Sequence, residues 1–302
     1  MPCYLIRMEK KLAEMRLLAS KAGNKITETA IPRVAMVQGE IPEHRLTAVY
    51  EPMINLILTG SKSMTVGDKT WQYNPATYFV MSVDLPAVGK VFADERTGAP
   101  YLAVSLTPKP EIIAELLDGM PGSGKMHLYN AGFSVAPVTS ELLDAWLRML
   151  RLFNKPEEIF ALAPAYEREI LFRVLQGPQG WMLRDIATPE SHLARIYKVI
   201  NWLKQHYMRT VRVEELAAMA ALSVSAFHRH FQAITALSPV QYQKRLRLMQ
   251  ARLKLATTGD SITAIAHAVG YQNHTQFSRE YGRHFGLSPS SDQKNITLFR
   301  NI

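Results

Sequence analysis

Cysteine is nearly absent from this 302-residue chain, which contains a single one, Cys3. One cysteine excludes an internal disulfide and favours a reducing cytoplasm, because disulfide frameworks belong to oxidising compartments. Long apolar runs are also lacking, and none approaches the ~20 residues that a membrane-spanning helix needs. The first residues, MPCYLIRMEKKLAEM, lack the apolar stretch and small-residue cleavage site of a secretory signal. We expect them to form a helix or a loosely held terminus, in a cytoplasmic protein with no membrane partner.

Histidine is scarce in the first 190 residues, where only His44 and His127 occur. A metal-dependent enzyme on a β-barrel needs several histidines with a carboxylate to hold iron, manganese or zinc. We find neither an H-x-H pair in that part nor a Ser/His/Asp or Cys/His arrangement with a recognisable frame. The loop MPGSGK at residues 120–125 lacks the Walker spacing of a phosphate site. We therefore expect no catalytic residue, no metal and no cofactor.

Charge divides the chain into two parts. Residues 191–302 contain 15 Lys and Arg against 5 Asp and Glu, whereas residues 1–190 contain 20 against 21. A basic domain of this size is typical of a nucleic-acid binder, because neutralisation of phosphates supplies much of the affinity. A basic membrane-surface helix is the competing interpretation, but it requires a broad exposed apolar face. At this length the chain has room for two domains, and we place them at residues 1–188 and 189–302.

The basic part contains an internal repeat. SAFHRHFQAITALSP at residues 225–239 matches TQFSREYGRHFGLSP at residues 275–289 with a constant offset of 50. A repeat of about fifty residues is too short for two independent domains and predicts two small helical units. Each copy predicts a helix, a short turn and a second helix, at about residues 213–235 and 262–286. This is the helix-turn-helix pattern.

Capping residues mark the boundaries of these helices. Ser223 or Ser225 is suited to begin the second helix of the first copy, and Ser261 and Asn273 precede the two helices of the second copy. Gly270 suits a left-handed turn between them. A helix is expected before the repeat at residues 191–208, and another within it at residues 239–257. The latter, about 25 Å long, would let the second helices enter successive major grooves about 34 Å apart.

The second helix of each unit has an apolar and a polar face. Phe227, Phe231 and Ile234 share one side at helical spacing, as do Phe277, Tyr281 and Phe285. Arginine can bind guanine with two hydrogen bonds, and hydroxyl and amide groups bind either base type. A solvated helix face is the competing interpretation for one copy, but both copies have Arg at the same position. We predict that the polar faces read bases, and the candidates are Ser225, His228, Arg229, Gln232, Thr275, Ser278 and Arg279. We also predict that residues of the helix between the two units contact phosphates, and the candidates are Lys244, Arg245 and Arg247.

The first part of the chain consists of short strand-like segments. They lie at residues 46–50, 53–58, 63–66, 70–73, 77–82, 88–92 and 101–106, and turn signals such as GD at residues 67–68 separate them. Many short strands at such spacing predict a β-barrel or jelly roll. Polar-tipped aromatics with methionine would suit a pocket for a small organic effector, although packing in the core or on the surface explains each one equally well. The candidate pocket residues are Tyr50, Met53, Trp71, Tyr73, Tyr78 and Tyr101.

A helical section is expected from about residue 138, after a helix at residues 110–118. One helix covers residues 142–153, and another begins at Pro164 or Glu167 and ends at residues 176–180. These helices either pack on the barrel or pair with a second subunit. For the second case the candidate homodimer seam is Leu143, Leu147 and Leu150. The expected linker is residues 186–192.

Several segments of the basic part resemble the DNA-binding domain of AraC/XylS-type transcription regulators of bacteria. The resemblance covers roughly residues 191–292 and includes LAAMA (216–220), SVSAFHRHF (223–231), GY (270–271) and QFSREY (276–281). VYEP (49–52), MSVDLP (81–86) and YEREIL (166–171) resemble an AraC-type N-terminal domain, a cupin-like fold without a metal. The resemblance implies an α+β two-domain regulator that binds double-stranded DNA at the nucleoid, as a homodimer, with RNA polymerase as a further candidate partner. It adds His274 and Gln276 to the base-reading candidates.

Two departures from the family pattern stand out. Position 225 is a small serine, and SSDQK (290–294) replaces the usual arginine-bearing closing helix. The alternative function is a small-molecule-binding or cupin-type enzyme with an accessory nucleic-acid-binding domain.

Overall fold

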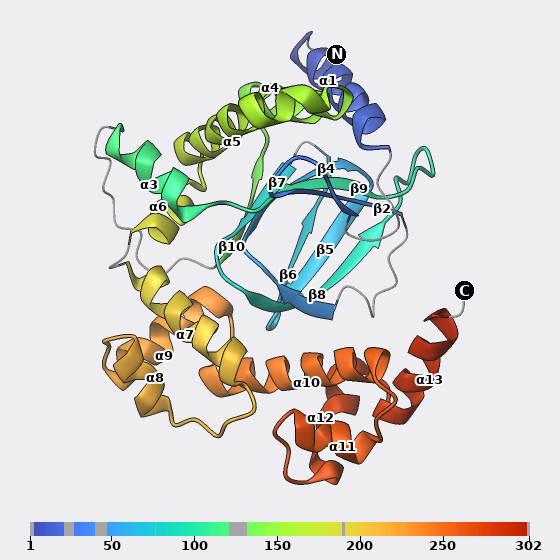
Figure 1. Cartoon of the computed structure of the whole chain (residues 1–302), viewed down its shortest axis with the longest axis vertical. Helices are drawn as coiled ribbons and strands as arrows, with labels where there is room; N and C mark the ends of the chain where they lie inside the picture. The colour runs from blue at the N-terminus through green and yellow to red at the C-terminus, as the bar shows by residue number, and fades with distance from the viewer. Residues whose placement is uncertain are drawn as a thin grey trace. The chain divides into compact units, whose positions relative to one another are not determined.

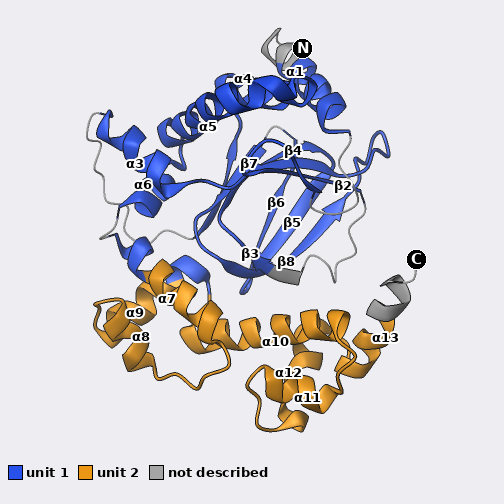
Figure 2. Ribbon diagram, in the orientation of Figure 1, with its two compact units in different colours: residues 1–195, 233–236 blue, residues 196–232, 237–302 orange. Residues whose placement is uncertain are grey.

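The computed structural model describes residues 3–20, 27–39, 47–75, 77–120, 132–188 and 191–300 (Figure 1). The chain divides into two compact units, residues 1–195 with 233–236 and residues 196–232 with 237–302 (Figure 2). The first unit contains the sheets and the second is helical, so the predicted α+β organisation is confirmed. Residues 189–190 of the expected linker, and all but Met120 of the loop at residues 120–125, lie outside the described residues.

Two antiparallel sheets form the centre of the first unit. One has the order β1-β2-β9-β4-β7-β10 and the other β3-β8-β5-β6. Consecutive strands repeatedly change sheet, as expected for a jelly roll. The six-stranded sheet contains β1 (Thr27–Glu28), β2 (Val34–Gln38), β4 (Met53–Thr59), β7 (Thr77–Met81), β9 (Leu102–Leu106) and β10 (Phe133–Pro137). The four-stranded sheet contains β3 (Thr47–Tyr50), β5 (Ser61–Val66), β6 (Lys69–Tyr73) and β8 (Leu85–Phe92).

Gly60 is the single residue that joins β4 in one sheet to β5 in the other. Its φ of +71° is in the left-handed region, and a Cβ there would lie 2.2 Å from the carbonyl oxygen of Phe92. Only glycine meets both conditions without displacing the backbone. This tight crossing fixes where β5 begins and which of its side chains face the other sheet.

Helices cover the outer face of the six-stranded sheet (Figure 1). They are α1 (Cys3–Ala19), α3 (Pro110–Asp118), α4 (Ser140–Arg151), α5 (Ile159–Gln176) and α6 (Gly180–Ala187). Leu56, Val80 and Val104 of the sheet share one hydrophobic core with Met15 of α1 and Trp146 of α4. The N-terminal residues therefore form a helix, the first of the two expected possibilities.

The candidate dimer seam lies in this core. Leu143, Leu147 and Leu150 are exposed by only 0%, 5% and 0% of their surfaces and belong to the cluster between the helices and the sheet. Two arrangements were expected for these helices, and the three leucines pack on the sheet. They retain almost no surface with which to meet a second copy.

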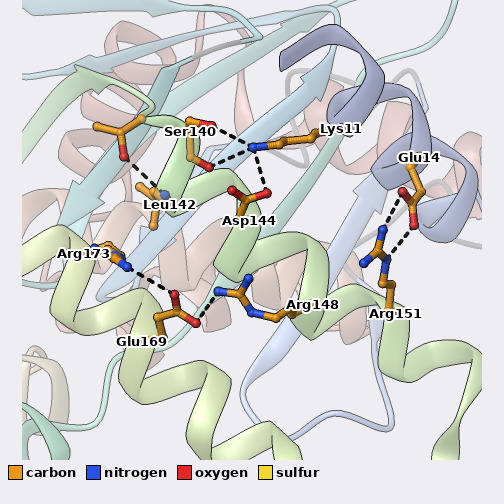
Figure 3. A network of polar contacts seen from close by, with 10 residues as sticks. Lys11, Glu14, Ser140, Leu142, Asp144, Arg148, Arg151, Glu169 and Arg173 are labelled. Atoms are coloured by element: carbon orange, nitrogen blue, oxygen red, sulfur yellow. Dashed lines mark hydrogen bonds and ion pairs between the residues drawn. The ribbon is translucent and has the colours of Figure 1, made fainter. Parts of the chain in front are cut away.

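Charged residues on the outer side of the helices join α1, α4 and α5 (Figure 3). Lys11 of α1 donates to the hydroxyl of Ser140 at 2.7 Å and forms an ion pair with Asp144 at 2.8 Å. Arg151 of α4 donates from Nε and Nη2 to the two oxygens of the Glu14 carboxylate, at 2.7 and 2.9 Å. Glu169 of α5 pairs with Arg148 and, at 3.6 Å, with Arg173. Since these groups are partly exposed to water, each pair adds at most about 1 kcal/mol.

The start of α5 differs from the sequence prediction. The helix begins at Ile159, so Pro164 lies inside it, and the short 3-10 turn Pro156–Glu158 precedes it. Proline removes one backbone hydrogen bond, here to the carbonyl of Phe160 near the start of the helix. Phe160 is 94% exposed, so water can reach this carbonyl. Strands β1, β2 and β10 and helix α6 were not predicted either.

The second unit consists of helices. They are α7 (His192–His206), α8 (Val213–Met219), α9 (Val224–Thr235), α10 (Pro239–Thr257), α11 (Ile262–Ala268), α12 (His274–Phe285) and α13 (Pro289–Arg300). Helices α8 and α9 form the first helix-turn-helix, and α11 and α12 form the second. Between them, α10 begins with Ser238 and Gln241 in a reciprocal capping box and spans about 28 Å.

Candidate nucleic-acid interface and barrel interior

Side-chain caps start the helices of the repeat at the predicted positions. The Ser223 hydroxyl accepts from the Ala226 amide at 3.3 Å, so Ser223 and not Ser225 caps α9. Ser261 accepts from the Ala264 amide at 3.2 Å, and the Asn273 side chain accepts from the amides of Thr275 and Gln276 at 2.8 and 3.2 Å. These caps satisfy amides that have no partner within the helix.

The turns of the two copies use different residues for the same backbone conformation. Gly270 has a φ of +90°, and Ala221 at the matching position has +52°. A Cβ on Gly270 would lie 2.6 Å from the carbonyl oxygen of Met208, so glycine also permits a close approach there. In the first copy alanine tolerates a conformation that L-residues rarely adopt.

The aromatic residues of each copy point inward and pack together. The Phe227 and Phe231 rings lie 5.4 Å apart, and Phe231 meets Tyr242 of α10 edge-on at 5.4 Å. In the second copy, rings at equivalent positions follow the same arrangement, with Phe277 and Tyr281 5.5 Å apart and both fully buried. Because one side of each second helix is used for this packing, the opposite side is left for other contacts.

The predicted base-reading residues lie on that opposite side. On α9, Ser225, Arg229 and Gln232 are exposed and His228 is half-buried. On α12, Ser278 is half-buried, and the exposed candidates are His274, Thr275, Gln276 and Arg279. Gln276 also donates to Glu280 at 3.3 Å. The two helices thus expose an arginine at the same position of each copy.

Of the three phosphate candidates, Arg247 has a different environment from a solvated surface arginine. Its Nε donates to the carbonyl of Tyr207 at 2.7 Å, and its Nη1 donates to that of Gly270 at 3.1 Å. Its Nη2 donates to the carbonyls of Met208 and Arg209 at 3.1 and 3.0 Å. Arg247 therefore ties the loop between α7 and α8 to the turn of the second helix-turn-helix. The sequence shows only a basic helix face, which gives no sign of this structural role.

Lys244 is tied to α12 through Glu280. Its ammonium lies 3.0 Å from Glu280 Oε1, while Tyr271 donates to Oε2 at 2.9 Å. Partial burial acts to raise the pKa of Glu280, but the hydrogen bonds from Lys244, Tyr271 and Gln276 outweigh it, and the pKa is lowered. The carboxylate is therefore charged and holds α10 and α12 together. Arg245 is half-buried on the same helix.

The closing segment SSDQK supplies a buried brace. Asp292, 2% exposed, accepts from the Tyr281 hydroxyl at 2.6 Å and pairs with Arg252 at 2.9 Å. These contacts fasten α13 to α10 and α12. The unusual ending thus has a structural use that no sequence pattern indicated.

The predicted effector residues do not all lie on one face of the barrel. Tyr73 and Trp71 of β6 point toward the other sheet, where their rings lie 4.9 Å from Phe79 and 5.1 Å from Phe133. Tyr78 instead belongs to the core under the helices, and its hydroxyl would lie 3.0 Å from a Cβ on Gly177. Burial raises the pKa of Tyr78 to about 12. Tyr78 therefore does not line the interior between the sheets, and its prediction as a pocket residue is wrong.

Tyr50, Tyr73 and Tyr101 are buried together. Burial raises the pKa of all three phenols, and their mutual electrostatic interaction raises those of Tyr73 and Tyr101 further. Met53 is half-buried at the start of β4 and pairs in register with Met81. Among the described residues, no hydrogen-bond partner exists for the Tyr73 and Tyr101 hydroxyls.

Sequence reasoning missed Lys62, the most unusual residue of the interior. It is 7% exposed, in register with Tyr73, and its ammonium lies 4.6 Å from the centre of the Tyr50 ring. Burial lowers its pKa to about 7. The sequence SKSMTV contains no signal of this position, because polar residues occupy the first three places of the strand.

No group of three potential metal ligands occurs in the described ranges, but His44 and His127 lie outside them. In the part of the chain that the structure describes, no helix has the length and apolarity required to cross a membrane.

Comparison with known proteins follows the division into units. Residues 30–182 match the family model of the AraC-type transcriptional regulator N-terminus, and residues 216–295 match a helix-turn-helix domain. The HTH-type transcriptional activator RhaS of Escherichia fergusonii is 40% identical over 143 residues, which are 46% of this chain and 51% of RhaS. RhaS of Klebsiella pneumoniae is 36% identical over 123 residues, 40% of this chain and 44% of its own length. The chain thus spans about half the length of the curated relatives it matches.

A solved structure shares the fold of the chain. Fatty-acid-bound ToxT from Vibrio cholerae aligns with a TM-score of 0.53 at 11% identity, over 86% of this chain and 94% of ToxT. At that identity the likeness concerns the fold alone. Because the N-terminal family model covers more than half of the residues, the chain belongs to the AraC-type transcriptional regulators.

Proposed function

We propose that this chain is a transcription factor that binds double-stranded DNA in a sequence-specific manner through α9 and α12. The observation that carries the proposal is the repeated helix-turn-helix, in which the aromatics are buried and an arginine is exposed at the same position of each copy. Arginine on a helix of this kind pairs bidentately with guanine in the major groove. The basic charge of the same part of the chain supplies the attraction to phosphates.

We also propose that the first unit senses a small organic effector. ToxT, which shares the fold, has been solved with a bound unsaturated fatty acid. Homodimerisation and contact with RNA polymerase are further parts of the proposal. A dimer interface has to use a surface other than Leu143, Leu147 and Leu150, since these are buried.

Substitution of the two arginines tests the reading faces. Arg229→Ala and Arg279→Ala should each weaken binding to the preferred DNA by about 1–3 kcal/mol, roughly 5- to 150-fold, and relax the sequence preference locally. Gel-shift titration against genomic fragments measures both effects. Arg96→Ala, which removes the same charge from an exposed turn of the first unit, is the control and should leave affinity nearly unchanged.

Absence of any preferred fragment for the unaltered protein would refute sequence-specific binding. Unchanged binding by both arginine variants, with a preferred fragment in hand, would show that other residues read the DNA.

A further inference from the structure

The ammonium group of Lys62 lies inside the barrel, and no described residue forms an ion pair with it. Lys62, Met64 and Val66 occupy alternate positions of β5 and are exposed by 7%, 0% and 1%, so this side of the strand faces the other sheet. The ammonium lies over the Tyr50 ring, 4.6 Å from its centre. Neutral or charged, a buried amine without a hydrogen-bonding partner destabilises the fold. Such a group is retained where something else binds it.

Two further donors in the same interior lack partners among the described residues. The hydroxyl of Tyr73, across the strand pair from Lys62, and that of Tyr101 are buried without a hydrogen bond. Tyr50, Tyr73 and Tyr101 are close enough to influence one another electrostatically, so the three phenols and Lys62 form one cluster, hereafter the Lys62 cluster. Native proteins satisfy nearly all buried polar atoms, so two unsatisfied hydroxyls beside a buried lysine indicate a ligand.

The chemistry of the cluster selects the charge of that ligand. An ammonium and two phenols are donors, and no described carboxylate forms an ion pair with Lys62. A carboxylate offers four acceptor positions on two oxygens and would satisfy all three donors. A neutral amide of the same shape offers fewer acceptors and no countercharge.

The surroundings of the cluster select the body of the ligand. Trp71, Phe79 and Phe133 form a chain of ring contacts at 5.1 Å each beside Tyr73. Flat aromatic groups pack on such rings in offset or edge-on geometry.

We propose that the interior of the barrel binds a small organic carboxylate with an aromatic body, whose carboxylate meets Lys62, Tyr73 and Tyr101. The proposal rests on the proposed function in one respect, since it assigns a chemical class to the effector of the first unit.

Matched pairs of probes test the charge preference on the full-length protein. Benzoate and phenylacetate are compared with benzamide and phenylacetamide by calorimetry and by thermal shift near neutral pH. We expect the two acids to bind and raise the melting temperature, and the amides to bind at least tenfold more weakly. Equal binding of acids and amides, or no binding of either acid at millimolar concentration, would overturn the proposal.

Variants assign the preference to the cluster. Lys62→Met keeps the side-chain volume, should fold at least as well as the unaltered protein, and should weaken benzoate binding at least tenfold. Lys90→Met is the control, because Lys90 pairs in register with Ser63 and lies on the other face of the same sheet. Tyr73→Phe and Tyr101→Phe should weaken benzoate severalfold, whereas Tyr78→Phe under the helices should not. Full retention of benzoate affinity by Lys62→Met would also refute the proposal.

DNA binding of the same samples, measured by gel shift, separates the two proposals. If the unaltered protein binds DNA sequence-specifically but binds no carboxylate, only the proposal that the Lys62 cluster is an effector site is refuted. Absence of sequence-specific DNA binding in the unaltered protein refutes the proposed function, whatever benzoate does.

Discussion

Lys62 is an ordinarily charged residue in a buried environment. A lysine in water is charged across the physiological range, but burial lowers the pKa of Lys62 to about 7. Lys62 is only 7% exposed, so its ammonium is far less hydrated than that of a surface lysine. The stability of the fold must therefore depend on pH through this one group.

The direction of that dependence follows from the proton balance. Above a pH of about 7 the folded protein loses the proton of Lys62, while the unfolded chain keeps it up to the ordinary lysine value of 10.5. The free energy of unfolding contributed by Lys62 therefore rises with pH from about 7, by up to about 1.4 kcal/mol per pH unit. Above about pH 10 the raised pKa values of Tyr50, Tyr73 and Tyr101 oppose this rise, because the unfolded phenols then release protons first.

Urea unfolding of the unaltered protein and of Lys62→Met measures the effect between about pH 6.5 and about pH 9.5, an interval in which the folded and unfolded states differ in their bound protons. The stability difference between the two should shrink as the pH increases, with Lys90→Met following the unaltered protein. Parallel curves for unaltered protein and Lys62→Met would contradict the burial of this lysine.

Ala221 is a second residue in an unusual state. Its φ of +52° is left-handed, and the repeat has glycine at the matching position. Left-handed backbone costs an L-residue about 1–2 kcal/mol, and glycine avoids this while losing about 0.5–1 kcal/mol of chain entropy. Ala221→Gly should therefore stabilise the second unit by roughly 0.5–1 kcal/mol in thermal or urea unfolding.

Ala218→Gly is the matched control for this substitution. Ala218 is exposed inside α8, where glycine should destabilise by about 1 kcal/mol. If both substitutions lowered the free energy of unfolding, the backbone of Ala221 would not be strained.

Among the elements, α10 determines how the two helix-turn-helix units are held together. Tyr242 packs on the aromatic core of the first helix-turn-helix, and Leu248 and Leu255 belong to the core of the second helix-turn-helix. Arg247 donates to four carbonyls. Those of Tyr207 and Arg209 also accept from Gln243, but those of Met208 and Gly270 would lose their side-chain donor without Arg247. Arg247→Ala should therefore lower the free energy of unfolding by about 2–3 kcal/mol and weaken DNA binding with it.

Lys254→Ala, which removes one positive charge from the same helix, is the comparison for Arg247→Ala and should have a small effect on stability. The measurement is urea unfolding beside gel shift. Weaker DNA binding by Arg247→Ala at unchanged stability would restore the phosphate contact expected from the sequence.

Local sequence signals predicted the helices and turns of the basic part well, but they did not predict how the strands pair. The caps at Ser261 and Asn273 and the turn at Gly270 were readable, because they depend on residues a few positions apart. The order of strands, and the inward direction of Lys62, depend on which strands β5 pairs with, and three polar residues at its start give no alternation to interpret. The brace at Asp292 joins residues up to 40 positions apart, which no local pattern encodes.

The molecule as a whole separates its charge between its two parts. Residues 191–302 have a net charge of +10, from 15 basic and 5 acidic residues, while residues 1–190 have −1, from 20 and 21. For B-DNA, each phosphate contact adds about −0.9 to the slope of log K against log salt concentration. Six contacts therefore imply roughly a thousandfold loss of affinity between about 50 and 200 mM salt. We expect gel-shift affinity to fall this steeply. Lys90→Met in the first unit should keep the slope, whereas Arg279→Ala should reduce it only if that arginine meets phosphate rather than a base edge. A shallow slope in the unaltered protein would mean that the positive excess does not face DNA, and the assignment of the reading surface to the basic unit would fail with it.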